Sequence, residues 1–203
     1  MKANGRLFFL IVVLLLCAAA TTAVILSYRP PHETTTEHNY NEWLTDWRRK
    51  IRVIAGEGRY SEAERLLRNY LNYAPDDNEM RRLLGKLLFD GGNRSGALKA
   101  YYAILLRDPG DFIARNNFAV ALVGDRRLDE AVREFADAYE ASGHEGFIGL
   151  NLVGAYALSG AEKAARELTA EIDKQYHGRV EVPFDALMLG GTSKVLAGDT
   201  VPR

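Results

Sequence analysis

The sequence has only one cysteine, Cys17, among its 203 residues. A single cysteine cannot form an intrachain disulfide, and His144 and His177 have no cysteine partner with which to hold a metal. The net charge is −1 at pH 7, from 26 Lys and Arg against 27 Asp and Glu. This balance gives the chain no overall attraction to nucleic acid or to anionic lipid. The composition therefore argues against a disulfide-stapled domain and a nucleic-acid-binding protein.

Motifs that carry catalysis are missing as well. Gly91-Gly92 and Gly190-Gly191 lack the lysine and the strand-to-helix context of a phosphate-binding loop. No Gly-x-Ser-x-Gly nucleophile elbow occurs, and the only thiol lies within an apolar run. We therefore expect no enzymatic activity, no cofactor and no metal site.

One long apolar run is present, LFFLIVVLLLCAAATTAVIL, from Leu7 to Leu26. As an α-helix rising 1.5 Å per residue it would be about 30 Å long, which matches the core of a bilayer. Lys2 and Arg6 precede the run, and Arg29 is the one basic residue that follows closely. The positive-inside bias predicts a cytoplasmic segment (1–6), a transmembrane signal-anchor helix (7–26) and a body on the extracytoplasmic or periplasmic side.

The alternative for this run is a signal peptide cleaved near Ala20 or Ala23, which would release an exported soluble protein. The apolar residues Val24, Ile25 and Leu26 continue beyond the small-residue site, as an anchor requires. A polar stretch with a Pro30-Pro31 pair follows, and residues 27–41 are expected to form a linker.

A 34-residue period dominates the rest of the chain. Alanines, prolines and polar residues typical of helix starts recur at this step (Ala63, Ala97 and Ala131; Pro75 and Pro109; Ser61, Ser95 and Asp129). A period of roughly 20 to 50 residues is typical of stacked solenoids built from one repeated unit. Apolar residues at helical spacing make each unit a pair of helices, and the polar residues are expected to cap the second helix. Ser61 and Glu64 fit a capping box.

The period divides residues 42–178 into units of about 44–77, 78–111, 112–145 and 146–178. The fourth unit drifts, because Lys163 replaces the capping residue, and Leu168 and Ile172 are expected to take over the apolar face. Residues 179–203 are expected to supply a capping helix and a tail, since a solenoid needs its open end covered.

These residues resemble the tetratricopeptide repeat family, whose pattern is W-x2-L-G-x2-Y, A-x3-F and a closing proline. The matching residues are Trp47, Leu84-Gly85, Tyr156, Ala131 with Phe135, Pro75 and Pro109. The resemblance spans about Leu44 to Gly178. It implies an all-α fold: a right-handed solenoid of about four helix-turn-helix hairpins with a C-terminal capping helix, preceded by the N-terminal transmembrane helix. It also implies close helix contacts at the small residues.

In tetratricopeptide arrays the first helices line a groove that takes a peptide or a helix, so the resemblance points to these helices. Seven residues stand in neighbouring rows there: Arg48, Arg52, Arg82, Lys86, Asn116, Asn117 and Asn151. Arginine forks onto carboxylates, and asparagine both donates to and accepts from a peptide backbone. We expect this groove to bind an acidic segment or a free carboxyl terminus. The alternative is that these residues form solvated helix faces paired with Glu42, Asp46 and Glu79.

Together these features predict a membrane-anchored protein–protein interaction module, a scaffold or assembly factor of a cell envelope. The alternative is a constitutive structural subunit of an oligomeric or multiprotein membrane complex. A permanent subunit should show a large apolar patch, whereas a module that binds a client should show a concave polar groove.

Overall fold

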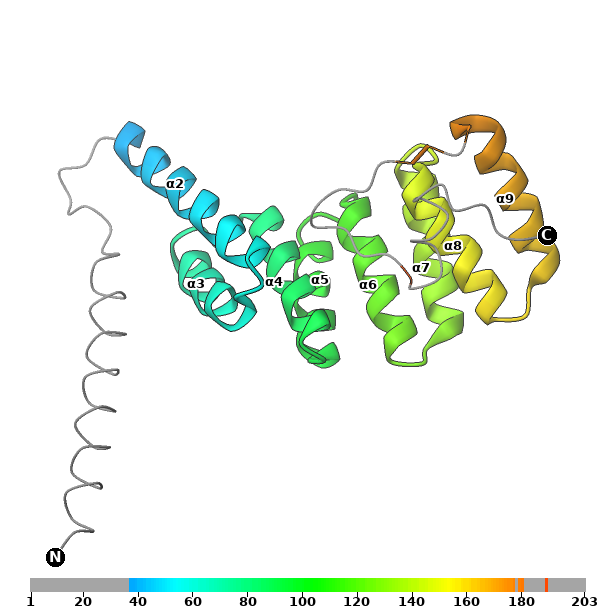
Figure 1. Ribbon diagram of the computed structural model, residues 1–203, viewed down its shortest axis with the longest axis horizontal. Coiled ribbons are helices and arrows are strands. Elements are labelled where there is room, and N and C mark those ends of the chain that lie inside the picture. The colour runs from blue at the N-terminus through cyan, green and yellow to red at the C-terminus, as the bar shows by residue number, and fades with distance from the viewer. Residues whose placement is uncertain (1–36, 178, 181–188, 190–203) are drawn as a thin grey trace, which may run out of the picture. The chain divides into compact units, whose positions relative to one another are not determined.

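The computed structural model describes residues 37–177, 179, 180 and 189, and its regular secondary structure there is entirely α-helical (Figure 1). The helices are α2 (Glu37–Gly56), α3 (Tyr60–Tyr73), α4 (Asn78–Asp90), α5 (Arg94–Leu105), α6 (Phe112–Gly124), α7 (Leu128–Ala141), α8 (Gly146–Leu158) and α9 (Glu162–Tyr176). The predicted all-α class is confirmed for this part of the chain. The predicted segments 1–6 and 7–26, and the cleavage sites near Ala20 and Ala23, lie outside the described residues. Among the helices that are described, none combines the length and the apolar character needed to cross a membrane.

The chain divides into two compact units, residues 1–49 and residues 50–203. In the first unit α2 begins at Glu37, so residues 37–41, which were expected to belong to the linker, are helical. The reason is an aromatic face that starts before the expected boundary. The rings of Tyr40 and Trp43 stack with centroids 5.7 Å apart, and those of Trp43 and Trp47 lie 4.8 Å apart.

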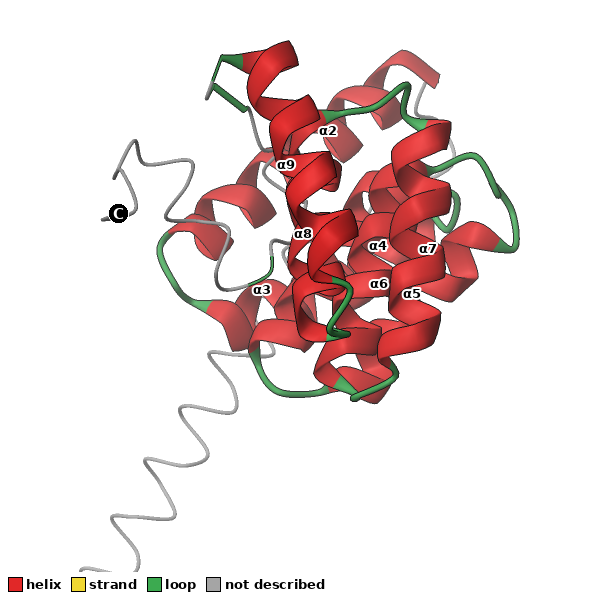
Figure 2. Cartoon of the chain, turned by 90° about the vertical axis from the view of Figure 1, so that its right-hand side faces the viewer, coloured by secondary structure: helices red, strands yellow, loops and turns green. Residues whose placement is uncertain are grey.

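In the second unit three helical hairpins, α4/α5, α6/α7 and α8/α9, stack one after another (Figures 1 and 2). Their first helices begin at Asn78, Phe112 and Gly146, each 34 residues after the last. The first helices contact one another, α4 with α6 and α6 with α8, and the second helices pack between them. One side of the stack is therefore lined by first helices, and we call it the inner face.

Small residues allow the paired helices to approach closely, as the repeat pattern implied. The recurring alanines Ala63, Ala97 and Ala131 are fully buried. A Cβ atom added at Gly85 of α4 would lie 2.5 Å from Cε1 of Tyr101 in α5, closer than real Cβ atoms approach their neighbours. Gly85 is thus required by the contact between the two helices of one hairpin.

The predicted caps of the second helices are wrong. Helices α3, α5 and α7 begin before Ser61, Ser95 and Asp129, so these residues lie inside the first turn. The short inter-helix turns bring the helix start forward. Asn93 caps α5 and accepts a hydrogen bond from the backbone N–H of Gly96, while α3 and α7 have no side-chain cap.

Two first helices, α4 and α6, are capped by aspartates one period apart, whereas Glu145 before α8 makes no side-chain cap. Asp77 accepts from the N–H of Met80 at 3.0 Å, and Asp111 accepts from the N–H of Ala114 at 2.8 Å. The closing prolines belong to the same loops. The carbonyl of Pro75 accepts from Arg81, and that of Pro109 accepts at 2.8 Å from Arg115, which is the equivalent arginine one repeat later.

The fourth sequence unit, which forms the hairpin α8/α9, departs from the repeat pattern as expected. Leu168 and Ile172 of α9 are buried. Helix α9 ends at Tyr176, and His177 adopts a left-handed conformation with φ of 49°. Arg179, Val180 and Leu189 are not helical. The rest of the expected capping helix and tail within 179–203 lies outside the described residues.

Candidate peptide-binding face

The inner face carries six of the seven residues that the sequence assigned to a groove. Arg48 lies in the first compact unit, while Arg52 lies on the part of α2 that belongs to the second unit. Arg82 and Lys86 come from α4, Asn116 and Asn117 from α6, and Asn151 from α8. The first helices of successive hairpins thus supply these residues.

The basic residues of this face are paired within the chain. Arg52 forms an ion pair with Glu79, and both side chains are about 40% exposed, at 43% and 40%. Lys86 pairs with Asp90 one helical turn further along α4, at 3.3 Å. Exposed pairs of this kind contribute about 0 to 1 kcal/mol, because solvent screens them. The alternative of a local ion pair with Glu79 therefore describes Arg52.

Arg82 makes a different kind of contact. Its Nη1 lies 2.6 Å from Oδ2 of Asp111, and the two side chains are only 14% and 8% exposed. The other oxygen of Asp111 caps α6, so one carboxylate joins α4 to the start of the next hairpin. Removing one member of a buried pair costs about 3 to 5 kcal/mol, because it leaves an uncompensated charge. Arg82 thus helps to hold two hairpins together.

The three asparagines are the buried polar residues of the described chain, each at 0% relative exposure. Nδ2 of Asn151 donates to Oδ1 of Asn116 at 2.8 Å, and Nδ2 of Asn116 donates to Oδ1 of Asn117 at 3.1 Å. In these two bonds Asn116 and Asn117 accept through their Oδ1 atoms, and Asn151 and Asn116 donate through their NH₂ groups. A buried amide is costly without such partners, so the three residues form one connected network, which we call the asparagine row.

The asparagine row ends on the backbone of a distant residue. The N–H of Leu189 donates to Oδ1 of Asn151 at 2.8 Å, in a buried hydrogen bond that spans 38 residues of sequence. Leu189 itself is 9% exposed. An amide on the inner face therefore holds the backbone of a non-helical residue of the same chain.

Two features of this face were not predicted from the sequence. The carboxylates of Asp111 and Asp90 pair with Arg82 and Lys86, and the signal for Asp90 was its place one helical turn after Lys86. The place of Leu189 was not predicted either, because it depends on chain folding over a long distance. The burial of the asparagines could not be read from residue type, because asparagine is mostly exposed.

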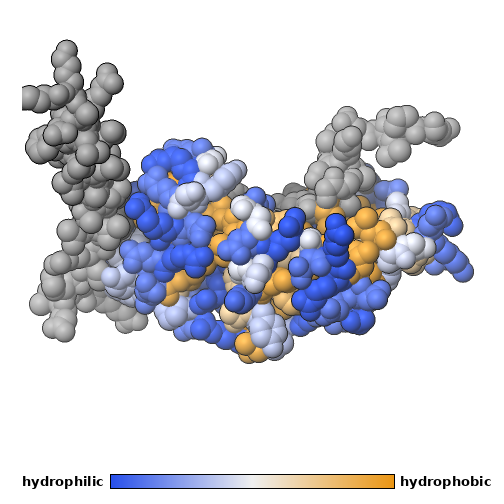
Figure 3. All heavy atoms as spheres, turned by 90° about the horizontal axis from the view of Figure 1, so that it is seen from below, coloured by the Kyte–Doolittle hydropathy of each residue, from blue (hydrophilic) through white to orange (hydrophobic). Residues whose placement is uncertain are grey.

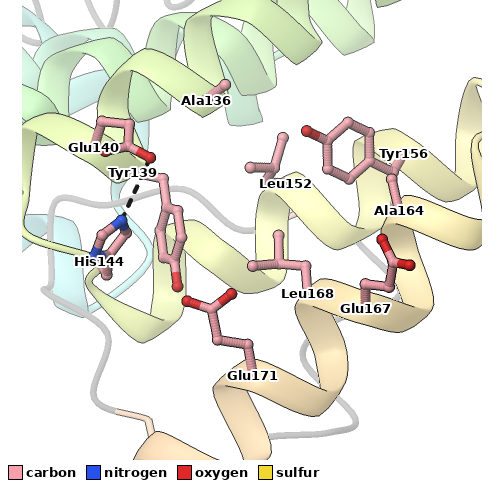
Figure 4. A pocket seen from close by; sticks show the side chains of 10 residues that line it. All are labelled: Ala136, Tyr139, Glu140, His144, Leu152, Tyr156, Ala164, Glu167, Leu168 and Glu171. Carbon is pink, nitrogen blue, oxygen red and sulfur yellow. Dashed lines mark hydrogen bonds and ion pairs between the residues drawn. The ribbon is translucent and has the colours of Figure 1, made fainter.

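A pocket with a volume of about 350 Å³ lies among α7, α8 and α9, apart from the asparagine row (Figure 4). Tyr139 and Glu171 face each other there, and Glu140 contacts His144 at 3.4 Å. Burial, together with the negative charge of Glu171, raises the pKa of Tyr139 to about 12. The phenol therefore stays neutral at physiological pH.

Comparisons with known proteins agree with this architecture. Residues 55–117 match the family model described as tetratricopeptide repeat. Residues 55–117 are therefore similar to tetratricopeptide repeats, and helical hairpins continue beyond them to α9. No curated protein matches the chain in sequence.

Solved structures with a similar fold include MamA (AMB-1), at 22% identity and a TM-score of 0.55, covering 63% of this chain and 76% of that one. YrrB, described as a TPR protein with an unusual peptide-binding site, has 20% identity and a TM-score of 0.55, covering 68% and 73%. The O-GlcNAc transferase of Thermobaculum terrenum has 22% identity and a TM-score of 0.63, but the match covers 70% of this chain and only 27% of that one. At these identities the likeness concerns the fold.

Proposed function

We propose that this chain is a protein–protein interaction scaffold that binds an extended polypeptide on the inner face of its tetratricopeptide repeats and carries out no catalysis. The observation that carries the proposal is the hydrogen bond from the Leu189 N–H to Asn151 Oδ1. It is a backbone group held by a buried side-chain amide, which is how such a face would hold a partner. The similarity to YrrB, described as having a peptide-binding site, supports the same use.

The surface favours a client-binding module over a permanent structural subunit. Large apolar side chains that are exposed in the described residues come from several different helices and loops: Val53, Tyr60, Tyr73, Tyr102, Leu106 and Leu158. Figure 3 shows one face of the molecule, on which apolar and polar side chains alternate. Obligate interfaces are larger and more continuous in their apolar area.

The remaining parts of the proposal concern place and partner. The apolar run from Leu7 to Leu26 would anchor the protein in a membrane with residues 1–6 cytoplasmic and the repeats on the extracytoplasmic side. A partner with an acidic segment would meet Arg52 on α2.

The test compares crosslinked partners of the wild-type chain and of Asn151→Ala, with the full chain expressed in its own membrane. The variant loses the acceptor of the backbone hydrogen bond, and a buried hydrogen bond left unmade costs about 1 to 3 kcal/mol. We therefore expect partner recovery to fall roughly tenfold. Asn72→Ala, an exposed asparagine on α3, is the matched control and should recover the partner normally.

Circular dichroism separates a loss of binding from a loss of folding, and a second variant checks it. Asn117→Ser keeps an oxygen that can accept from Asn116 and should retain the helical circular dichroism of the wild type. Unchanged partner recovery by an Asn151→Ala protein that is as helical as the wild type would refute the proposal.

A further inference from the structure

Leu189 occupies the inner face in the way that a bound peptide would. It lies 38 residues beyond Asn151, outside the helical hairpins, and its backbone N–H reaches the asparagine row. The residue as a whole is buried, with a relative exposure of 9%. Both the main chain and the side chain of this residue are therefore engaged.

The hydrogen bonds of the asparagine row all run in the direction that the Leu189 N–H requires. A backbone N–H can only donate, so Asn151 turns its Oδ1 toward Leu189. Its Nδ2 faces Oδ1 of Asn116, and Nδ2 of Asn116 faces Oδ1 of Asn117. The amide orientations of the three residues are therefore compatible with a backbone donor at this end of the row.

We propose that Leu189 is an intramolecular ligand of the inner face, and that the partner is an extended segment presenting a leucine-like residue whose N–H takes the same place. The partner and Leu189 then exclude each other, so the face is held closed until a partner displaces the contact. This inference rests on the proposed function, because it assumes that the asparagine row is where a partner binds.

The chemistry defines which segments fit. The acceptor on Asn151 recognises a backbone N–H, which every residue but proline has, so this contact selects an extended chain and excludes proline at that position. Burial of the side chain selects an apolar residue there. The site thus accepts a short apolar segment with a free amide at its centre.

An intramolecular ligand competes strongly even when its contact is weak. A ligand that belongs to the same chain as its site has an effective concentration on the order of 1 mM. If the face binds a free segment with a dissociation constant of about 0.1 mM, the attached segment raises the apparent constant about tenfold. Removal of the intramolecular contact should therefore tighten binding of an external peptide by about that factor.

The experiment uses a fluorescent peptide with the chain's own sequence from 183 to 195, PFDALMLGGTSKV, added to the full chain in detergent. Fluorescence anisotropy measures its binding to the wild type and to Leu189→Pro, which lacks the donor N–H. We expect the peptide to bind Leu189→Pro about ten times more tightly than the wild type. The chain variant Val195→Pro, which adds a proline elsewhere in the same segment, is the matched control and should bind like the wild type.

Two further arms identify the contact. A peptide carrying the same Leu189→Pro change should bind at least ten times more weakly to every chain, and Asn151→Ala combined with Leu189→Pro should lose the tight binding. Leu189→Ala in the chain keeps the N–H and removes the apolar side chain, so it should tighten peptide binding by less than Leu189→Pro does.

The outcomes separate this inference from the proposed function. Equal affinity of the wild type and Leu189→Pro for the peptide, with binding still lost on Asn151→Ala, would overturn the intramolecular competition and leave the inner face as the binding site. Peptide binding that is unaffected by Asn151→Ala, or absent from all chains, would also overturn the inference. The proposed function is then judged separately, by the crosslinked partner of Asn151→Ala in the membrane.

Discussion

The contact between Gly85 and Tyr101 yields the sharpest stability prediction. A Cβ atom at residue 85 would lie 2.5, 2.7 and 3.0 Å from three ring atoms of Tyr101, whose side chain is fully buried. The ring has no room to move, so Gly85→Ala should incur an overpacking cost of about 2 to 3 kcal/mol. Better helix propensity returns about 1 kcal/mol. The net loss should be about 1 to 2 kcal/mol, or roughly 2 to 8 °C in Tm.

The neighbouring repeat contains a natural solution to the same clash. At the positions equivalent to Gly85 and Tyr101, one repeat later, the chain has Ala119 and Phe135, and both are fully buried. One repeat earlier the same pair is Ile51 and Leu67. A larger side chain on the first helix of a hairpin is thus accompanied by a smaller or differently shaped side chain at the facing position of the second helix.

The double variant Gly85→Ala with Tyr101→Phe reproduces the pair found in the next repeat. We expect a double-mutant cycle to show a favourable coupling of about 1 kcal/mol, because the phenyl ring without its hydroxyl can shift away from the new methyl group. Thermal unfolding followed by circular dichroism measures all four proteins.

Gly124→Ala is the matched control for this cycle. The atoms nearest a Cβ there are 3.1 Å away or more and belong to the exposed side chain of Arg94 and to the half-buried ring of Phe89, both of which can shift slightly. Its Tm should stay within about 2 °C of the wild type. If Gly85→Ala were as stable as Gly124→Ala, or if the double variant lost the sum of the single losses, the packing argument would be wrong.

Three further predictions concern single side chains. Arg82→Met should lower the free energy of unfolding, measured in urea, by about 3 kcal/mol, because the buried carboxylate of Asp111 loses its cation. Lys86→Met should lower it by less than about 0.5 kcal/mol, because the ion pair of Lys86 is exposed. Asn93→Ala should cost about 1 kcal/mol as the loss of a helix cap, while Ser95→Ala should cost nothing measurable, and equal losses would contradict the observed cap. The pKa of Tyr139 is raised from 10 to about 12, so the unfolded chain releases the phenol proton at a lower pH than the folded chain does. The contribution of Tyr139 to the free energy of unfolding is therefore complete below pH 10 and falls by about 2 to 3 kcal/mol as the pH approaches 12. Tyr139→Phe should flatten that slope, and an unchanged slope would refute the assignment.

The sequence predicts the repeat architecture because packing inside a hairpin depends on local spacing. Ala97 and Tyr101 of α5 are four residues apart and therefore share a helix face, and both are fully buried. Helix starts are predicted less well. Ser95 has the chemistry of a cap, but the turn after α4 is short enough for Asn93 to begin the helix first. Residue type alone does not decide between two capping residues that lie two positions apart.

For the candidate site, the sequence predicts which helix positions are equivalent, but neither the hydrogen bonds nor the burial of the side chains at those positions. The 34-residue step brings Asn117 and Asn151 to equivalent places on α6 and α8, as expected. The hydrogen bond, however, joins Asn151 to Asn116, which is one residue off that step. Burial depends on what covers the inner face, and Leu189 arrives there from a part of the chain that has no repeat pattern. Long-range contacts of this kind leave no periodic signal in a sequence.

The pairing of the cations changes what an acidic partner could use. An acidic segment that took Arg52 from Glu79 would break an exposed ion pair worth about 0 to 1 kcal/mol, so exchange there is nearly free. Taking Arg82 from Asp111 would separate a buried pair and weaken the join between two hairpins, at about 3 to 5 kcal/mol. Under the proposed function, an acidic group would therefore meet Arg52 of α2, while the asparagines of α6 and α8 would hold the partner's backbone. A charge-reversing Arg52→Glu change should consequently weaken binding of an acidic partner without loss of Tm, whereas Arg82→Glu should lower the Tm whether or not a partner is present.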